Sequence, residues 1–409
     1  MIKHALSYGV IAAGLSLAGA NAAQATEEPA SLFDNIDVSG QIALEARWFP
    51  EDAQFDNQFD GTQLSGLIEP EFRYESDDRN NQLTFIPFFR LDSEDDNRTH
   101  GDVREAYWRH FGEDWEFTIG ANRVFWGVTE SRHLVNIINQ IDAVENIDEE
   151  DFLGQPMFQL SRQTDVGLFD LYLMSGFRER TFADDEGRLR GPLPVDDDAA
   201  RYTNSLNRYR PEVALRYSHY VGDVDIGLHI FHGIGREPDL IVAPNGRKLI
   251  PEYSLINQTG ADLQYTKDAW LWKLEALVRE GQGDTFAATV AGVEYTLYQI
   301  LESNADLGLL AEVLYDGRDD DVFQTAFDQD GFFGARITLN DIQDTAFLGG
   351  MVIDADDGLG SVRLEAGRRV GDSWKVELEG QAFLESENDA PGAVFQDDSF
   401  ITLRMSYFF

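Results

Sequence analysis

The sequence predicts an all-β protein: a closed antiparallel transmembrane β-barrel of about eighteen strands, with short periplasmic turns and long extracellular loops. Three observations support this prediction. Apolar and polar residues alternate with a period of two along most of the chain. The connections between the alternating segments are short and long in turn. The last segment, from Ile401, alternates without a break up to Phe409, an ending typical of the closing strand of outer-membrane barrels.

The first residues have the pattern of a secretory signal peptide. Lys3 and His4 precede an apolar stretch from Ala5 to Ala20, and small residues follow up to Ala25. We therefore expect 1–25 to be the signal peptide, 26–35 a short lead-in and 36–409 the barrel. The alternative, a membrane anchor, would need a longer apolar run, and no later segment approaches the roughly 20 apolar residues of a spanning helix.

The composition excludes several classes of function. The chain has no cysteine, so disulfides, thiolate metal sites and cysteine nucleophiles are ruled out. Its net charge of -42 argues against nucleic acid as a partner. We expect no cofactor and no metal site. The acidic runs in the loops, such as Asp92 to Asp96 and Asp319 to Asp321, lack the spacing of a calcium loop, and we interpret them as solvated acidic loops.

Short and long connections alternate along the chain, as they do in outer-membrane barrels. The tight turns include 111–114, 221–223, 267–268 and 371–373. The long polar stretches are 49–61, 92–102, 127–155, 178–208, 233–252, 317–330 and 386–398. The segments near 156–162 and 346–354 alternate least clearly, so sixteen strands is the alternative count.

Each strand has one apolar and one charged face. Trp270, Trp272 and Leu274 share one face, whereas Lys273 and Glu275 occupy the other. Charged residues that alternate with lipid-facing ones must line a wet interior. The candidate pore-lining residues on the strands are Glu71, Arg73, Arg216, Lys273, Glu275, Glu312, Arg336, Arg363 and Arg404. For most of them the alternative is ordinary cross-strand pairing along the wall.

Aromatic residues recur beside the tight turns. Trp115, Trp270 and Trp374 each begin a strand after such a turn, and Tyr407 and Phe409 end the last strand. Aromatic rings at one height form the girdle of a membrane interface. The alternative is the aromatic core of a soluble β-protein.

The long connection 127–155 is the candidate constriction. Its middle, from Leu134 to Ile141, is too apolar for a loop that lies free in water. Inside a polar barrel, such a loop would pack against the inner wall. We expect it to fold inward and narrow the channel, with Glu130, Arg132 and His133 near the narrowest point. A cap over the mouth of the barrel is the alternative.

One part of the chain resembles a known family. Val103 to Trp108 contains Arg-Glu-Ala-Tyr, and Trp115 to Arg123, Trp126-Gly127 and Asn139 to Asp142 follow it. These motifs are similar to those of Gram-negative porin-like barrels of the DUF1302 type and, more distantly, of phosphate-selective porins. The resemblance covers about fifty residues and implies the barrel fold. The chain lacks the lysine-rich constriction of the phosphate porins, so phosphate specificity is not carried over.

These observations predict a porin-like channel in the outer membrane for passive diffusion of small polar or cationic solutes. The expected partners are outer-membrane lipid, lipopolysaccharide and the barrel-assembly machinery, which would recognise the last strand; a homotrimer stays open. A structural or adhesin-type barrel is the alternative. A hydrolase is less favoured because no G-x-S-x-G motif is present. A transporter of hydrophobic substrates would need an apolar lumen, and the sequence indicates none.

Overall fold

The computed structural model describes residues 35–318, 329–355, 358–384 and 394–409. The predicted signal peptide 1–25, all but the last residue of the lead-in 26–35, and the acidic residues Asp319 to Asp321 lie outside them. The strands of the main sheet are β1 Ile36–Trp48, β2 Thr62–Glu75, β3 Asn81–Asp92, β4 His100–Phe111, β5 Trp115–Asn122, β6 Gln155–Thr164, β7 Gly167–Met174, β9 Glu212–Val221, β10 Val224–Ile234, β13 Leu255–Lys267, β14 Trp270–Glu280, β15 Phe286–Leu297, β16 Asp306–Asp316, β17 Gln329–Thr338, β18 Ala346–Asp354, β19 Gly358–Val370, β20 Trp374–Phe383 and β21 Phe400–Phe408.

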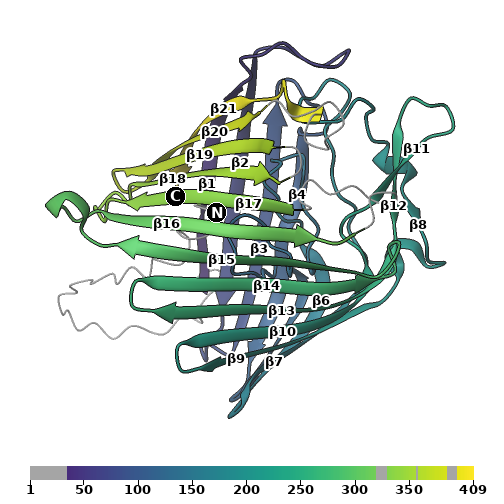
Figure 1. Ribbon diagram of the computed structural model, residues 1–409. Helices are drawn as coiled ribbons and strands as arrows, with labels where there is room; N and C mark the ends of the chain where they lie inside the picture. Colours follow the sequence, from purple (N-terminus) through teal and green to yellow (C-terminus); the bar gives the residue numbers. More distant parts are fainter. Residues whose placement is uncertain (1–34, 319–328, 356–357, 385–393) are drawn as a thin grey trace, which may run out of the picture.

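These eighteen strands form one closed antiparallel sheet (Figure 1). Each strand pairs with the next one along the chain, and β21 closes the barrel by pairing with β1 from Gln41↔Phe408 to Trp48↔Ile401. Closure leaves no strand edge unpaired. The predicted fold class is therefore confirmed, and the two weakest segments form β6 and β18, so the count is eighteen rather than sixteen.

From β1 to β14 the connections alternate in length as predicted. Between β14 and β19 the prediction is wrong, since 298–305 and 339–345 at the short-turn end are longer than 281–285 and 355–357 at the other end. Short turns such as 112–114, 222–223 and 371–373 lie at one end of the barrel. At the other end lie the long loops, of which five matter here: L2 (93–99), L3 (123–154), L4 (175–211), L5 (235–254) and the described part of L9 (384 and 394–399). A small second sheet of β8 Arg201–Tyr202, β11 Asp239–Val242 and β12 Leu249–Tyr253 joins L4 to L5, which the sequence did not predict. Three short 3-10 helices complete the described structure: η2 Asp197–Ala199, η3 Asn207–Tyr209 and η4 Ile300–Glu302. None of the described helices is long and apolar enough to cross a membrane.

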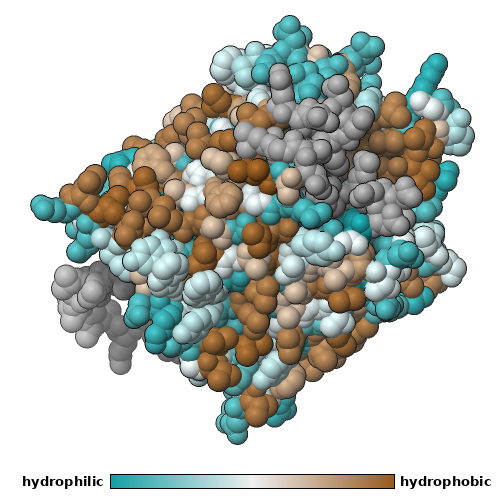
Figure 2. Space-filling view, in the orientation of Figure 1, coloured by the Kyte–Doolittle hydropathy of each residue, from teal (hydrophilic) through white to brown (hydrophobic). Residues whose placement is uncertain are grey.

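The outer surface of the barrel is apolar. Large hydrophobic side chains such as Leu44, Leu64 and Leu364 are more than half exposed on it, and Figure 2 shows apolar residues spread over the strands that face the viewer. The predicted girdle residues are also exposed, at the short-turn ends of their strands: Trp115, Trp270, Trp374, Tyr407 and Phe409. Trp374 packs against Tyr407, with 5.1 Å between ring centroids. An apolar band bordered by such rings is the surface that a lipid bilayer requires.

The interior is not an open tube, because L3 lies inside it. Of its residues, Val135, Ile138 and Asp142 are completely buried, although loops normally run over the surface of a protein. Since L3 spans from one side of the inner wall to the other, its contacts define the candidate functional site.

Candidate functional site

An apolar segment of L3 anchors the loop to one side of the barrel. Trp126, Val135, Ile137 and Ile138 form a buried cluster with inward-facing residues of five neighbouring strands, namely Met157, Tyr172, Met174, Ala214, Phe231 and Ile256. The apolar run that marked this loop in the sequence is thus used for burial, as expected from its composition. Arg216, a predicted pore-lining residue, lies beneath this cluster: it pairs with Asp262 at 2.8 Å and its guanidinium lies over the Trp126 ring.

Two carboxylates of the inner wall hold the backbone of L3. Glu275 of β14 accepts hydrogen bonds from the amides of Val128 (2.6 Å), Thr129 (2.9 Å) and Val135 (3.1 Å), and from the Thr129 hydroxyl. Gly127 allows this close approach, because it has a φ of +137° and a Cβ there would lie 3.1 Å from the Glu275 carboxylate.

Glu312 of β16 binds the next turn of the loop in the same way. It accepts hydrogen bonds from the amides of Glu130 and Ser131, both at 2.8 Å, and from the Ser131 hydroxyl. The backbone N–H groups that a buried loop must satisfy are therefore paired with acidic side chains of the wall. Both carboxylates were predicted as inward-facing, but their role as acceptors for L3 was not visible in the sequence.

The predicted constriction residues of L3 lie against β14 to β17. Glu130 pairs with Arg336 at 2.6 Å and with Lys273 at 3.5 Å. Burial raises the pKa of Glu130, but these two cations outweigh it and hold the pKa below its usual range. Arg132 contacts Asp316 at 3.2 Å and Glu237 of L5 at 3.4 Å. His133 packs edge-on against Phe125, with 4.7 Å between ring centroids.

The far end of L3 is fixed by buried arginines. Arg90 of β3 forms a two-pronged ion pair with Glu145, at 2.9 Å and 2.5 Å. Arg98 of L2 pairs with Glu45 at 2.6 Å and donates to the carbonyls of Val144 and Glu145. Planar guanidinium groups suit such sites because each presents several donors in a fixed geometry. These arginines were missed in the sequence, where nothing marks them as partners of a loop some fifty residues away.

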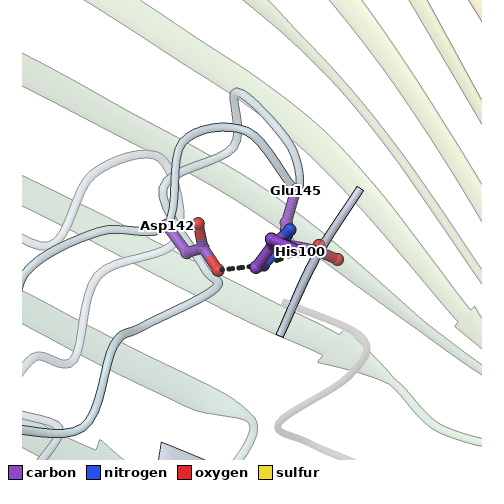
Figure 3. A group of neighbouring side chains, drawn as sticks. All are labelled: His100, Asp142 and Glu145. Carbon is purple, nitrogen blue, oxygen red and sulfur yellow. Dashed lines mark ion pairs between the residues drawn. The ribbon is translucent and has the colours of Figure 1, made fainter. Parts of the chain in front are cut away.

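A histidine lies between two carboxylates of L3 (Figure 3). His100 Nε2 of β4 is 3.4 Å from Asp142 and 3.7 Å from Glu145. The three groups lie close enough to one another to hold a metal ion. However, Arg104 binds Asp142 at 2.6 Å, and Arg90 binds both oxygens of Glu145. Since the carboxylates are already neutralised by arginine, the group fits an ion-pair network better than a cation site.

The acidic runs of the sequence are not all solvated loops, which corrects the expectation: Asp92 is the last residue of β3 and Asp316 the last residue of β16. The Asp92 carboxylate is fully buried and accepts hydrogen bonds from Gln63, Ser65 and Arg98. Asp316, next to the run that begins at Asp319, is fully buried as well and pairs with Arg132 and Arg318. Both carboxylates have cationic partners. A buried carboxylate without such a partner would lose roughly several kcal/mol of free energy through desolvation.

A narrow charged space separates the acidic end of L3 from the wall. It measures about 60 Å³ and lies between L3 residues 145–151 and strands β1, β3 and β19 to β21. Arg363 of β19 binds Asp148 of L3 at 2.7 Å and also contacts Glu365 and Glu379 of the wall. Arg404 lines the same space. This space is therefore much narrower than the cavity on the loop side of L3, which measures about 880 Å³.

A larger cavity lies on the loop side of L3. It measures about 880 Å³ and is enclosed by L3, L4, L5, L9 and the inner wall of β14 to β20. The two spaces share Asp148, Glu150, Arg363 and Glu365, so they meet at the Asp148–Arg363 ion pair. Burial and the neighbouring Asp148 raise the pKa of Glu150 to about 7.

Part of the wall of the large cavity is apolar, which also departs from the sequence interpretation. Leu277, Ala288, Phe332 and Val352 face inward from β14, β15, β17 and β18 and belong to one hydrophobic cluster with Leu134 of L3. Leu277 lies directly opposite Ala288, and Phe332 opposite Val352, so the apolar positions pair across strands. Lys273, Glu275 and Leu277 are alternate residues of β14 and therefore share its inward face. Extending the alternation from the two charged residues to Leu277 could have revealed this apolar patch.

A hub of ion pairs borders this wall. Glu237 of L5 contacts Arg279 at 2.9 Å, Arg318 at 3.0 Å and Arg132 at 3.4 Å. The pKa of Glu237 lies well below its usual range, because the three arginines outweigh the effect of burial. No local pattern marks this hub in the sequence, since Glu237 is one of many acidic residues in the long loops.

The remaining predicted pore-lining pair lies away from L3. Glu71 and Arg73 form an ion pair with each other on β2, near its short-turn end, and their side chains are partly exposed. The structure thus places the other ten candidates in L3, against it or beside one of the two spaces: Glu130, Arg132, His133, Arg216, Lys273, Glu275, Glu312, Arg336, Arg363 and Arg404.

The comparisons with known proteins agree with the fold. No family model matches the chain, and no curated protein matches it significantly. Among solved structures, the chain is similar to Pseudomonas aeruginosa OccK8 (OprE), with a TM-score of 0.52, 10% identity, and coverage of 93% of this chain and 99% of that one. It is also similar to Pseudomonas aeruginosa OccK3 (OpdO), with a TM-score of 0.51, 12% identity, and coverage of 91% and 96%. At this identity the likeness shows that the chain has the barrel fold of outer-membrane channels.

Proposed function

We propose that the protein is a porin-like channel of the Gram-negative outer membrane, through which small polar solutes diffuse passively. The observation that carries the proposal is the position of L3. The loop lies inside a barrel of eighteen strands and is bonded to opposite sides of its wall, to Glu275 of β14 and Glu312 of β16 on one side and to Arg90 of β3 on the other. Arg363 of β19 binds the loop between these two sides. Barrels of this size are wide enough for an aqueous channel unless an internal loop narrows them.

The solute path follows the spaces that L3 leaves. A solute enters the 880 Å³ cavity from the loop side, passes the Asp148–Arg363 ion pair, and continues through the charged space between L3 and β19 to β21. Ion pairs that line a pore exchange hydrogen bonds with water and solute, and they disfavour apolar molecules at the narrowest point. Glu130, Arg132 and His133 line the entrance cavity of this path.

A mild preference for small cations follows from the charge of the chain. With 74 acidic and 32 basic residues, the protein is strongly negative, and a field of that sign raises the local concentration of cations at the mouth. The internal arginines are paired with carboxylates, so they offset this field only in part.

Several finer assignments belong to the same proposal. The chain is a DUF1302-type barrel, its residues 1–25 are removed on export, and the assembly machinery recognises β21. The apolar outer band contacts lipid, lipopolysaccharide surrounds the loop end, and a homotrimer is the proposed assembly. The ionisable groups inside the barrel are arranged as ion pairs, which favours a channel over the hydrolase alternative.

Planar-bilayer recording of the refolded protein tests the proposal. We expect discrete conductance steps, a larger step after deletion of residues 130–150, and a reversal potential in a salt gradient that indicates cation preference. Absence of any conductance both with and without the deletion would contradict the channel and leave the structural barrel. Anion selectivity would contradict only the assignment of charge preference.

A further inference from the structure

The 880 Å³ cavity has the size of a small-molecule binding site. One side of it is the apolar wall formed by Leu277, Phe332 and Val352. L4 contributes further apolar lining through Phe182, Leu189 and Leu193. A path for small polar solutes has no need of such apolar surfaces, since they disfavour water. They do provide contacts for a solute with an apolar body.

Arg180 of L4 lines the same cavity and has unfilled donors. Its Nε and Nη2 atoms are buried and have no hydrogen-bond partner. Its remaining terminal nitrogen makes only a 3.5 Å contact with Glu149, a residue whose side chain is 46% exposed. Two buried N–H donors without acceptors are costly, and the cost is removed when a ligand supplies the acceptors.

The two unfilled nitrogens of Arg180 lie on one edge of the guanidinium, where they present parallel N–H groups. This edge matches the two oxygens of a carboxylate or sulfonate, which accept such a pair side by side. The position of the residue is fixed, because its backbone amide donates to the hydroxyl of the fully buried Tyr253 at 2.9 Å. The backbone of L4 thus holds Arg180 at the edge of the cavity, and its guanidinium is left to bind an anionic group.

We propose that the cavity binds an amphipathic organic anion, with its carboxylate or sulfonate on Arg180 and its apolar body against the wall of Leu277, Phe332 and Val352. This proposal rests on the proposed channel function and adds to it one class of solute, which binds in the entrance cavity. Small inorganic cations pass in response to the field of the whole protein, whereas the organic anion is held by short-range contacts that this field does not provide.

Calorimetric titration of the refolded, full-length protein in a nonionic detergent tests the site. The probes are hexanoate, acetate, which has the same anionic group without the apolar body, and hexylammonium, which has the same body with the opposite charge. Empty micelles give the background. We expect saturable binding of hexanoate to one site, and no comparable binding of acetate or hexylammonium.

Variants separate the two halves of the site. Arg180→Gln is expected to weaken hexanoate binding at least about tenfold, which is about 1.4 kcal/mol, and Arg180→Lys to restore only part of it because lysine has no planar fork. Leu277→Ser is expected to weaken hexanoate binding severalfold. The matched control is Arg208→Gln, because Arg208 belongs to the same loop but is exposed and does not line the cavity; it should change the affinity less than twofold.

Two results would overturn the site. The first is binding of hexylammonium as tight as that of hexanoate. The second is a hexanoate affinity of Arg180→Gln equal to that of both the wild type and the Arg208→Gln control. The outcome is independent of conduction. Saturable binding by a protein that conducts no ions would contradict the channel and support the site, whereas conductance without hexanoate binding would contradict the site and support the channel.

Discussion

The attachment of L3 to Glu275 gives a prediction whose size follows from the structure. Glu275→Ala removes the acceptor of three backbone amides, those of Val128, Thr129 and Val135, and of the Thr129 hydroxyl. A buried donor left without an acceptor costs roughly 1–3 kcal/mol. Allowing for water that enters the vacated space, we expect the free energy of opening this part of L3 to fall by about 3–5 kcal/mol.

Hydrogen exchange followed by mass spectrometry measures this opening directly. At about 1.4 kcal/mol for each factor of ten, the amides of the peptide 126–136 should exchange roughly a hundredfold faster or more in Glu275→Ala. Glu275→Gln should have a smaller effect, roughly five- to thirtyfold, because its amide oxygen keeps the acceptor for Val128 and Thr129 while its NH₂ group cannot accept from Val135. The strand ladder around position 275 uses only backbone groups, so exchange within β13 and β15 should not change.

The control is Glu69→Ala, since Glu69 also faces inward but accepts only a 3.4 Å hydrogen bond from Gln41 and forms no hydrogen bond or ion pair with L3 among the described residues. The reasoning would be refuted if the amides of 126–136 were as well protected from hydrogen exchange in Glu275→Ala as in the control and the wild type. It would mean that L3 is held by its apolar anchor alone.

Three further predictions concern pH, the outer loops and the membrane interface. Because the pKa of Glu150 is raised to about 7 from an ordinary value near 4.3, the folded protein holds this proton more tightly than the unfolded chain. The stability that the protonated Glu150 contributes is present below about pH 4.3 and is lost as pH rises through about 7. Hydrogen exchange of the peptide 146–152, corrected for the intrinsic rate, should therefore increase from pH 5 to pH 8. Glu150→Gln should abolish that increase. Arg188 of L4 is buried, pairs with Asp398 of L9 at 2.5 Å and donates to two carbonyls of the 49–61 loop. Arg188→Ala should lower the free energy of opening these loops by about 3–5 kcal/mol and make L4 and L9 sensitive to protease. Protease resistance equal to that of the wild type would contradict this role. Trp374→Ala removes an exposed ring that packs on Tyr407; it should lower the free energy of unfolding in lipid vesicles by about 1–2 kcal/mol, and an unchanged value would argue against the girdle.

The fold could be predicted from the sequence because its signal is local. A strand that crosses a bilayer needs apolar residues at every second position, so even the weak segments that became β6 and β18 kept enough alternation to be recognised. The inward position of L3 was predicted for a similar reason, since the run from Leu134 to Ile141 is incompatible with a solvated loop.

The contacts of the site could not be predicted in the same way. Arg90, Arg98 and Glu237 meet their partners across sequence separations of tens of residues, and no local pattern distinguishes them from the other charged residues of loops and wall. The apolar wall at Leu277 and Phe332 was overlooked because the inward face of each strand was inferred from its charges. The small sheet of β8, β11 and β12 consists of short strands in long loops, where alternation is too brief to be informative.

The central claim is that L3 lines the route through the barrel, and the absence of cysteine from the chain allows a direct measurement. In Asp148→Cys the new thiol lies where the two spaces meet, so a water-soluble methanethiosulfonate carrying a bulky charged group should react with it and reduce the single-channel current at each open channel. The matched control is Arg208→Cys, because Arg208 is exposed and does not line the cavity. Its thiol should react without changing the current. Complete modification of position 148, verified by mass, with an unchanged current would contradict the claim that solutes pass between L3 and the wall.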